Sequence, residues 1–348
     1  MGIAMRKLCY FINSDWYFDL HWIDRAIASR DAGYEIHIIS HFIDDNIINK
    51  FKTFGFICHN VTLDAQSFNA LVFFRTYHDV QKIIKNIKPD LLHCITIKPC
   101  LIGGVLAKKF NLPVIVSFVG LGRVFSSDSM PLKLLRQFTI AAYKYIASNK
   151  RCIFMFEHDR DRKKLAKLVG LEEQQTIVID GAGINPEIYK YSLEQNHDVP
   201  VVLFASRMLW SKGLGDLIEA KKILRSKNIH FTLNVAGILV ENDKDAISLQ
   251  AVYSEGVPRI LLEASSVGRA CIAYDVGGCD SLIIDNDNGI IVKSNSPEEL
   301  ADKLAFLLSN PKARVEMGIK GRKRIQDKFS SGMIISKTLK TYHDVVEG

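Results

Sequence analysis

The sequence contains no apolar run of the ~18 residues that a membrane-spanning helix requires, although 48% of its 348 residues are hydrophobic. The first residues, MGIAMRKLCYFINSDW, lack both a long apolar region and a small-residue cleavage site, so no signal peptide is expected. No internal repeat or low-complexity segment is present. We therefore expect a cytoplasmic globular protein, which can also lie peripherally on the cytoplasmic face of the membrane.

The cysteines form no recognisable pattern. There are seven, an odd number, and no two of them form a Cys-x-x-Cys pair. Most stand in apolar, strand-like runs, so we expect buried free thiols in a reducing compartment rather than disulfides or a metal site. The seven are Cys9, Cys58, Cys94, Cys100, Cys152, Cys271 and Cys279.

Acidic residues are missing between Asp128 and Glu157, where five basic residues lie. At ~100° per residue of helix, four of these cluster on one stripe opposite an apolar stripe. Such a surface can contact anionic lipid headgroups or be an ordinary solvated face, and both readings stay open. The formal net charge of +7 also favours anionic partners over dedicated nucleic-acid binding. The basic stripe is Lys133, Arg136, Lys144 and Arg151, and the apolar one is Leu135, Phe138, Ala142 and Ile146.

The first half of the chain alternates continuous apolar runs with helix-length segments that mix polar and apolar residues. Continuous apolar strands separated by helices are typical of a parallel sheet covered on both faces. This pattern predicts a doubly wound α/β domain. The expected strands begin at Lys7, Glu35, Phe56, Asp90, Pro113, Arg151 and Thr176.

The length of the chain suits two domains. The polar stretch YSLEQNHDVP, residues 191–200, interrupts the alternation and is the expected linker. We therefore expect domains over residues 1–190 and 191–348, with the last helix able to return to the first domain. In the second half, strand-like runs begin at Val201, His230, Ala270 and Gly289, and helices follow from Pro297.

The second half contains an unusually short segment. Only 17 residues separate Gly237 from Glu255. Each parallel strand that is added to a sheet needs a crossover connection of a dozen residues or more. The second domain is therefore expected to have about four strands where a full doubly wound half would have about six.

The segment EGVPRILLEA places two glutamates, Glu255 and Glu263, around a helix start. Pro258 fits the first turn of a helix because its missing N–H costs nothing there. A helix N-terminus preceded by glycine offers free N–H groups and a positive dipole to a diphosphate. The two carboxylates could then bind sugar and ribose hydroxyls, although an amphipathic helix with two unrelated glutamates fits the same pattern.

A second motif, SRMLWSKG, follows the first strand of the second half and opens a helix. Loops at the carboxyl ends of parallel strands are where α/β domains bind ligands. Arg207 offers a bidentate fork and Lys212 a point charge, which together suit two phosphates. Two solvated basic residues are the alternative, but cations at a helix start are unfavourable unless an anion is present.

Together, the Arg-x4-Lys-Gly loop and the Glu-x7-Glu segment resemble glycosyltransferase family 4, whose members are retaining enzymes of the two-domain GT-B fold. The resemblance extends over nearly the whole chain and suggests the branch that builds O-antigen or capsule repeat units on a polyprenyl diphosphate lipid. It implies two Rossmann-like domains facing a cleft, the first binding the acceptor and the second the nucleotide sugar. Further segments that carry it are DWYF, AGYEIHIIS, DLLHCITIKPCLIGGVLAKKFNLP, VSFVGLGRVF and IDGAGIN.

The resemblance also implies the reaction. A hexose or N-acetylhexosamine would pass from a nucleotide sugar, expected to be UDP-linked, to a polyprenyl-diphosphate-linked saccharide in lipopolysaccharide or capsule synthesis. Arg207 and Lys212 would neutralise the leaving diphosphate, a stabilisation that needs no metal or other cofactor. Glu255 would hold the donor sugar, and Glu263 would bind the ribose. Glycines would let the backbone approach the donor closely: Gly120, Gly122, Gly181, Gly183, Gly213 and Gly256.

Two features depart from the family. Many members have a histidine in the loop where this chain has Val119 and Gly120, and most have a strand–helix–strand with a nucleobase loop in place of the short segment before Glu255. A non-catalytic remnant with a truncated donor domain is therefore the alternative function. His93 lies on an apolar strand, and the sequence leaves two readings of it open: a core histidine or an active-site contact.

Two other enzyme classes with this kind of fold are disfavoured. A dehydrogenase would show Gly-x-Gly-x-x-Gly after a first strand with an acidic residue downstream, and no such pattern occurs. The sugar-nucleotide epimerases are disfavoured by the context of the two glutamates in EGVPRILLEA. The donor sugar, the acceptor sugar and the linkage stay open.

Overall fold

The computed structural model describes residues 5–63, 69–126, 129–195, 197–206, 212–237, 258–294 and 296–347. The chain divides into two compact units. Unit 1 comprises residues 1–182 and 332–348, and unit 2 comprises residues 183–331. The end of the chain thus belongs to the N-terminal unit, and the division falls after Ala182.

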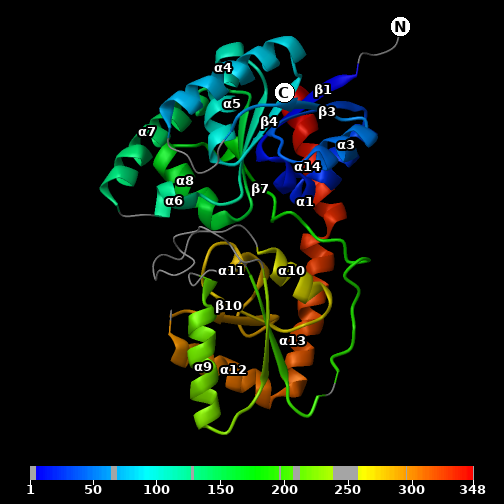
Figure 1. Cartoon of the computed structure of the whole chain (residues 1–348), viewed down its shortest axis with the longest axis vertical. Helices are drawn as coiled ribbons and strands as arrows, with labels where there is room; N and C mark the ends of the chain where they lie inside the picture. Colours follow the sequence, from blue (N-terminus) through cyan, green and yellow to red (C-terminus); the bar gives the residue numbers. More distant parts are fainter. Residues whose placement is uncertain are drawn as a thin grey trace. The chain divides into compact units, whose positions relative to one another are not determined.

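Unit 1 is built on a seven-stranded sheet (Figure 1). Its strand order is β3-β2-β1-β4-β5-β6-β7, and every neighbouring pair is parallel. The order reverses between β1 and β4, as in doubly wound folds. All seven expected strands form, so this part of the fold prediction is confirmed. The strands are β1 (Arg6–Ser14), β2 (Tyr34–His41), β3 (Ile57–Asn60), β4 (Leu91–Ile95), β5 (Val114–Phe118), β6 (Cys152–Phe156) and β7 (Thr176–Val178).

Helices cover both faces of this sheet, because β1, β4, β5 and β6 are apolar on both sides. One face packs against α4 (Ala70–Ile87), α5 (Ile97–Phe110), α7 (Met130–Ala147) and α8 (Asp159–Val169). The other packs against α1 (Asp15–His21), α2 (Ile23–Asp31), α3 (Asp45–Thr53) and α14 (Ser331–Glu347). The C-terminal helix therefore completes the core of the first unit. Short helices at α6 (Gly122–Ser126) and η1 (Glu173–Gln175) lie in the connections.

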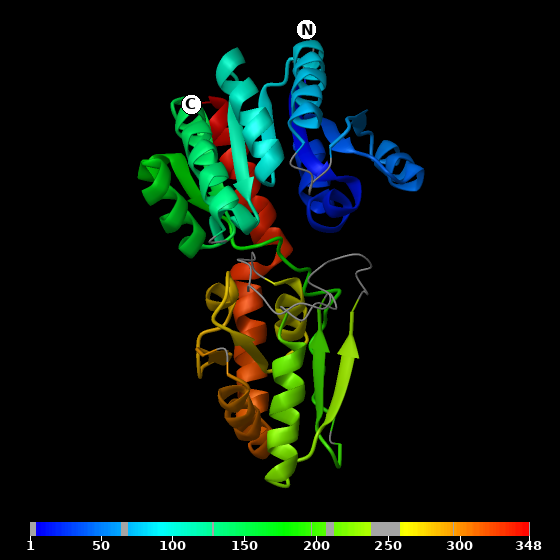
Figure 2. The same ribbon diagram turned by 60° about the vertical axis from the view of Figure 1, so that its left-hand side comes forward.

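Unit 2 contains two parallel strand pairs within its described residues. Figure 2 shows the pair formed by β8 (Val201–Ala205) and β9 (Thr232–Ala236) beside α9 (Leu214–Ser226). The second pair is β10 (Cys271–Tyr274) with β11 (Gly289–Val292). The short segment that the sequence indicates before Glu255 lies within residues 238–257, outside the described part. The other helices are α10 (Arg259–Ser266), α11 (Cys279–Leu282), α12 (Pro297–Ser309), α13 (Pro311–Arg324) and η4 (Ile325–Phe329).

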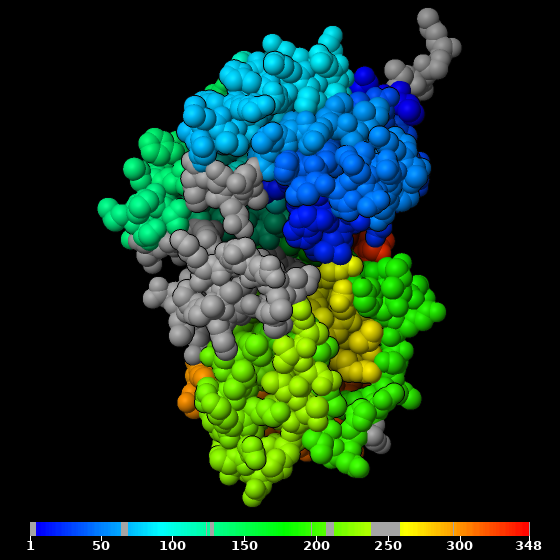
Figure 3. Space-filling model, in the orientation of Figure 1, coloured from blue at the N-terminus to red at the C-terminus, as the bar shows by residue number. Residues whose placement is uncertain are grey.

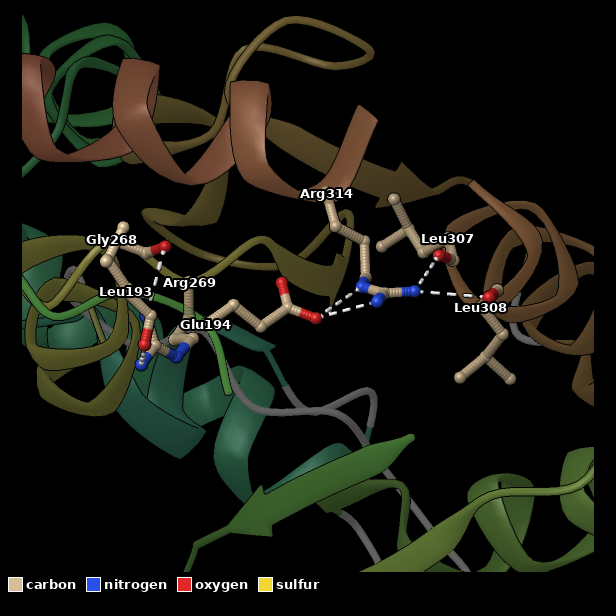
Figure 4. Close-up of polar contacts among 7 residues, drawn as sticks. All are labelled: Leu193, Glu194, Gly268, Arg269, Leu307, Leu308 and Arg314. Carbon is tan, nitrogen blue, oxygen red and sulfur yellow. Dashed lines mark hydrogen bonds and ion pairs between the residues drawn. The ribbon is translucent and has the colours of Figure 1, made fainter. Parts of the chain in front are cut away.

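The stretch expected to be a linker lies inside unit 2 and is bound to it (Figure 4). Arg314 on α13 contacts Glu194 through Nε at 2.9 Å and Nη2 at 2.7 Å. Its third nitrogen donates to the carbonyl oxygen of Leu307 at 2.7 Å. Arg269 donates to the carbonyl oxygen of Leu193 at 3.3 Å. Two arginines that lie far away in the sequence therefore fix a segment whose polar composition resembles that of a free linker.

Candidate functional site

Lys212 and Gly213 stand directly before α9, as expected for a motif that opens a helix. Gly213 is the N-cap residue and has φ +86°, a conformation that strains any L side chain. A Cβ there would also lie 3.1 Å from the ring of Tyr274. Tyr274, the last residue of β10, donates its hydroxyl to Asp216 on α9 at 2.9 Å. The start of α9 is thus fixed against the carboxyl end of β10, while Arg207 lies outside the described residues.

Glu263 lies on α10 and is about three-quarters buried, with 26% of its side chain exposed. Tyr189 donates its hydroxyl, and Arg259 its Nε, to the same oxygen, Oε1, each at 3.0 Å. Burial alone would lower the pKa of Arg259, but its hydrogen bonds with Tyr189 and Glu263 raise it. The Glu263 carboxyl group is therefore oriented by two donors on neighbouring elements. Pro258 is the N-cap of α10, and Glu255 and Gly256 lie outside the described residues.

Sequence reasoning did not identify Tyr189 as a partner of Glu263. Its backbone carbonyl accepts hydrogen bonds from Ser266 Oγ at 2.8 Å and Arg322 Nη1 at 2.7 Å. These contacts fix the loop that follows the IDGAGIN segment against α10 and α13. A tyrosine in a polar loop has no sequence pattern that reveals a contact 74 residues away.

Besides Gly213, four of the predicted glycines have positive φ: Gly120 at +146°, Gly122 at +64°, Gly181 at +68° and Gly183 at +79°. Gly120 and Gly122 follow β5, and Gly181 follows β7, so these three lie at the carboxyl edge of the sheet in unit 1. At Gly122, a Cβ would also approach Ile97 Cδ1 to 2.9 Å. Gly183 belongs to unit 2.

A pocket opens at the same edge of unit 1, where β5 and β6 end. Its lining residues include Arg25, Ser117 and Glu157 among mostly apolar neighbours. Its apolar lining residues are Trp22, Phe118, Val119, Met155, Phe156 and Ile179. The pocket has room for about one water-sized group, and residues with a guanidinium, a hydroxyl and a carboxyl group line it in an otherwise apolar setting.

Arg25 on α2 is a second residue that sequence reasoning missed. It is only 4% exposed, and burial lowers the pKa of its guanidinium. Its Nη2 donates to the carbonyl oxygen of Gly181 at 2.7 Å, and its Cζ lies 4.2 Å from the ring centroid of Trp22. Its Nε is buried and has no hydrogen-bond partner among the described residues. An arginine on a short polar helix suggests a solvated side chain, so its burial was not predictable.

His93 is fully buried in the core of unit 1. Its Nδ1 lies 2.6 Å from Tyr342 Oη, and its Nε2 lies 2.6 Å from Ser117 Oγ. Burial lowers its pKa well below the ordinary value, so the imidazole is neutral. Of the two readings left open by the sequence, the core histidine is the one observed, and His93 reaches the pocket through Ser117.

The basic stripe differs from the expected helical face. Helix α7 ends at Ala147, so Arg151 lies beyond it, directly before β6. Arg136 is half-buried, and its Nε donates to the carbonyl oxygen of Val124 at 2.7 Å. Phe138, expected on the inward stripe with Leu135, is 67% exposed. The helical phase that the sequence suggested was therefore only partly right.

The exposed face of α7 carries apolar side chains together with lysines. Met130, Leu134 and Phe138 are 77%, 63% and 67% exposed, at a spacing of four residues that places them in one row. Lys133 and Lys144 are exposed on the same helix. In Figure 3, α7 lies at the left-hand surface of unit 1. No helix in the described part of the chain is long and apolar enough to cross a bilayer.

The two parts of the sequence match two described families. Residues 7–156 match the family described as "Glycosyl transferase 4-like", and residues 238–324 match "Glycosyl transferases group 1". An N,N'-diacetylbacillosaminyl-diphospho-undecaprenol alpha-1,3-N-acetylgalactosaminyltransferase from Campylobacter jejuni is 24% identical, over 92% of this chain and 94% of that protein.

Solved structures resemble the whole chain. A glycosyltransferase from Rickettsia africae superposes with a TM-score of 0.74 at 17% identity, covering 99% of this chain and all of that one. Anabaena HepE, solved in complex with UDP, gives a TM-score of 0.71 at 16% identity, covering 97% of this chain and all of that one. At these identities the structural likeness establishes the fold.

Proposed function

We propose that this chain, a glycosyltransferase with the GT-B fold, transfers a hexose or N-acetylhexosamine from a UDP-sugar to a lipid-linked glycan used in surface polysaccharide synthesis. The observation that carries this proposal is the helix start at Lys212–Gly213, fixed against Tyr274, in the unit that also contains Glu263. The Campylobacter jejuni relative, whose name specifies a lipid-linked acceptor, supports the acceptor class. The UDP complex of Anabaena HepE supports the donor class.

The donor diphosphate would bind where the N-termini of α9 and α10 approach the carboxyl edge of β10. The start of α9 reaches this edge through the contact between Tyr274 and Asp216. Helix α10 precedes β10 in the chain and packs on it through Leu262, so its first residues point toward the same edge. Free N–H groups and helix dipoles favour an anion there. Lys212 would add a full charge, with Arg207 as its proposed partner.

Glu263 suits the proposed ribose contact. Because Tyr189 and Arg259 both donate to Oε1, the second oxygen is available to accept from a hydroxyl without losing its orientation. A carboxylate held in place by two donors costs less entropy when it binds a ligand. Glu255 is proposed to hold the donor sugar, and Gly256 to let the backbone approach it.

The proposed reaction retains configuration and needs no metal ion. The bond between the sugar carbon and the diphosphate oxygen breaks while an acceptor hydroxyl oxygen bonds to the same face of that carbon. The hydroxyl proton passes to the departing phosphate oxygen. Negative charge grows on the diphosphate, so Lys212, Arg207 and the helix N-termini would stabilise the transition state more than the ground state.

The acceptor is proposed to be presented at a membrane surface. The lysines of α7 would face anionic headgroups, while Met130, Leu134 and Phe138 would enter the interface beneath them. This surface belongs to unit 1, which is the proposed acceptor-binding domain.

Transfer assays on two variants test the donor site. Lys212→Ala should lower kcat by roughly 10²–10³-fold, the scale seen when one transition-state contact is removed, and Glu263→Ala should lower kcat/KM mainly by raising KM, because a ribose contact is made in the ground state as well. Lys222→Ala and Glu219→Ala are matched controls, because this pair forms an exposed ion pair on α9 and should leave the rate unchanged. Circular dichroism checks that the variants fold. Wild-type rates in both site variants would refute the assignment.

A further inference from the structure

A chain of buried hydroxyls and one imidazole runs through unit 1 from α2 to the pocket at the carboxyl edge of the sheet. Ser29 Oγ lies 3.3 Å from Tyr10 Oη, and Tyr10 Oη lies 3.2 Å from Tyr342 Oη. His93 then bridges Tyr342 and Ser117, with both contacts at 2.6 Å. All five side chains are at most 2% exposed. The chain ends at Ser117, which lines the pocket.

The direction of each hydrogen bond in this chain follows from its first member. Ser29 donates its only hydroxyl proton to the carbonyl oxygen of Arg25 at 2.8 Å. Tyr10 must therefore donate to Ser29, and Tyr342 donates to Tyr10. Because Tyr342 has no further proton to give, it can only accept from His93, which places the imidazole proton on Nδ1.

The directions of these hydrogen bonds determine whether the Ser117 hydroxyl can donate to a ligand or only accept from one. His93 is neutral, so with its proton on Nδ1 its Nε2 is an acceptor. Ser117 must then donate its proton to His93 and is left with only lone pairs for the pocket. A serine hydroxyl, which ordinarily rotates to suit any ligand, is here held as an acceptor by Tyr342 on the C-terminal helix.

The pocket offers complementary groups beside this acceptor. Arg25 supplies a buried guanidinium whose Nε has no partner among the described residues, and Glu157 supplies a carboxylate. A group that both donates and accepts at one atom satisfies this set, and a hydroxyl is such a group. A phosphate or carboxylate would satisfy Arg25 but would face the Ser117 lone pairs and the Glu157 charge.

We propose that this pocket binds one hydroxyl group of the acceptor sugar, which donates to Ser117 and accepts from Arg25, and that His93 and Tyr342 are positioning residues that set the direction of this recognition. The inference rests on the proposed function for the identity of the ligand as an acceptor sugar. It predicts strong selectivity, because a site built around a substrate hydroxyl leaves its own buried polar groups unpaired when that hydroxyl is missing.

The first test needs no transfer activity. Nitrogen-15 spectra of histidine-labelled full-length protein report which ring nitrogen of His93 carries the proton, with the signal assigned by comparison with His93→Gln. The proposal predicts the Nδ1–H form in the wild type and in Thr338→Val, a control that removes a buried hydroxyl from the same helix. It predicts loss of this single form in Tyr342→Phe. An Nε2–H form in the wild type would reverse the polarity of Ser117 and overturn the proposal.

The second test pairs changes in the enzyme with changes in the substrate. The probes are a short-chain polyprenyl-diphosphate-linked hexose and its monofluoro analogues, in which one hydroxyl at a time is replaced by fluorine, which cannot donate. At one position, fluorine should lower kcat/KM at least ~100-fold for the wild type but less than ~5-fold for Ser117→Ala. Thr139→Val, which removes another buried hydroxyl of unit 1, should behave as the wild type.

The outcomes separate the inference from the function on which it rests. Equal losses in the wild type and Ser117→Ala at every position would refute the pocket assignment while leaving the glycosyltransferase proposal intact. Absence of transfer to any unmodified lipid-linked sugar would contradict the proposed acceptor class, and with it the identity of the ligand proposed for this pocket.

Discussion

Glu263 shows how a residue that the sequence singles out depends on residues that it does not. The spacing of EGVPRILLEA marks the glutamate, and the Arg259 contact follows from a separation of one helical turn. The Tyr189 contact joins a distant loop to α10 and has no local signature. Half of the immediate surroundings of Glu263 could thus be predicted, and the other half depends on tertiary packing.

Replacing Tyr189 by Phe tests the role of this contact. The change removes one hydrogen bond to a charged oxygen, worth about 1.5–3 kcal/mol, and leaves Arg259 as the donor. We expect UDP affinity to fall roughly 3–30-fold. This is less than the full energy of the hydrogen bond, because Arg259 still orients Glu263 in the variant and only part of the energy is lost on binding. Calorimetric titration with UDP measures it, and Tyr191→Phe is the control. Unchanged affinity would show that Tyr189 does not orient the ribose contact.

Gly181 and Arg25 likewise pair a residue that the sequence marks with one whose position depends on tertiary packing. Gly181 was predicted because glycines in a loop after a strand permit close backbone approach, and its φ of +68° agrees with a glycine requirement. Arg25 could not be predicted, since buried arginines are rare and nothing in the residues around it indicates burial. Its contact with the Gly181 carbonyl joins residues 156 positions apart.

Among the elements, the strands of unit 1 were predictable because they are continuous apolar runs, which buried parallel strands require. The exposed face of helix α7 was less predictable. Its phase was inferred from a helix continued to Arg151, whereas it ends at Ala147. The apolar stripe opposite the basic residues was taken as the inward face, but the buried side of α7 is formed by Thr139, Ile140, Tyr143 and Ile146, and Phe138 is exposed.

The observed face of α7 leads to a prediction about membranes. The double variant Leu134→Gln, Phe138→Gln should lower co-sedimentation with vesicles containing phosphatidylglycerol at least ~5-fold, since two large apolar side chains contribute about 1.5–3 kcal/mol each when fully buried. Ile188→Gln, a change at a site 72% exposed in unit 2, is the matched control. Binding of the wild type to neutral and anionic vesicles alike would show that the lysines do not take part.

The linker is the element that the sequence misplaced. Residues 191–200 are polar and break the strand–helix alternation, which favours a free connection. The side chains of Arg314 and Arg269 instead bind this segment to unit 2. Ion pairs between residues 120 positions apart follow from the fold and not from local composition.

At the scale of the whole molecule, the two-unit fold could be predicted because each half carries its own periodic pattern, and the ordered motifs fit one architecture. The return of α14 to unit 1 places Tyr342 in the first core, 332 positions from its partner Tyr10. This gives the end of the chain a role in shaping the pocket of the first unit. The residues proposed to contact the donor diphosphate and ribose, by contrast, lie in unit 2, so their role can be tested separately from that of the unit 1 pocket.

Calorimetric titration with UDP in buffer containing EDTA tests the proposed donor site most directly. The wild type is expected to bind with a Kd in the micromolar range without a metal ion, and Lys212→Ala to bind roughly 10–100-fold more weakly, because it loses a charge-assisted contact to phosphate. Lys222→Ala should match the wild type. If the wild type failed to bind UDP in EDTA, or if Lys212→Ala bound it equally well, the diphosphate site at the start of α9 would be contradicted.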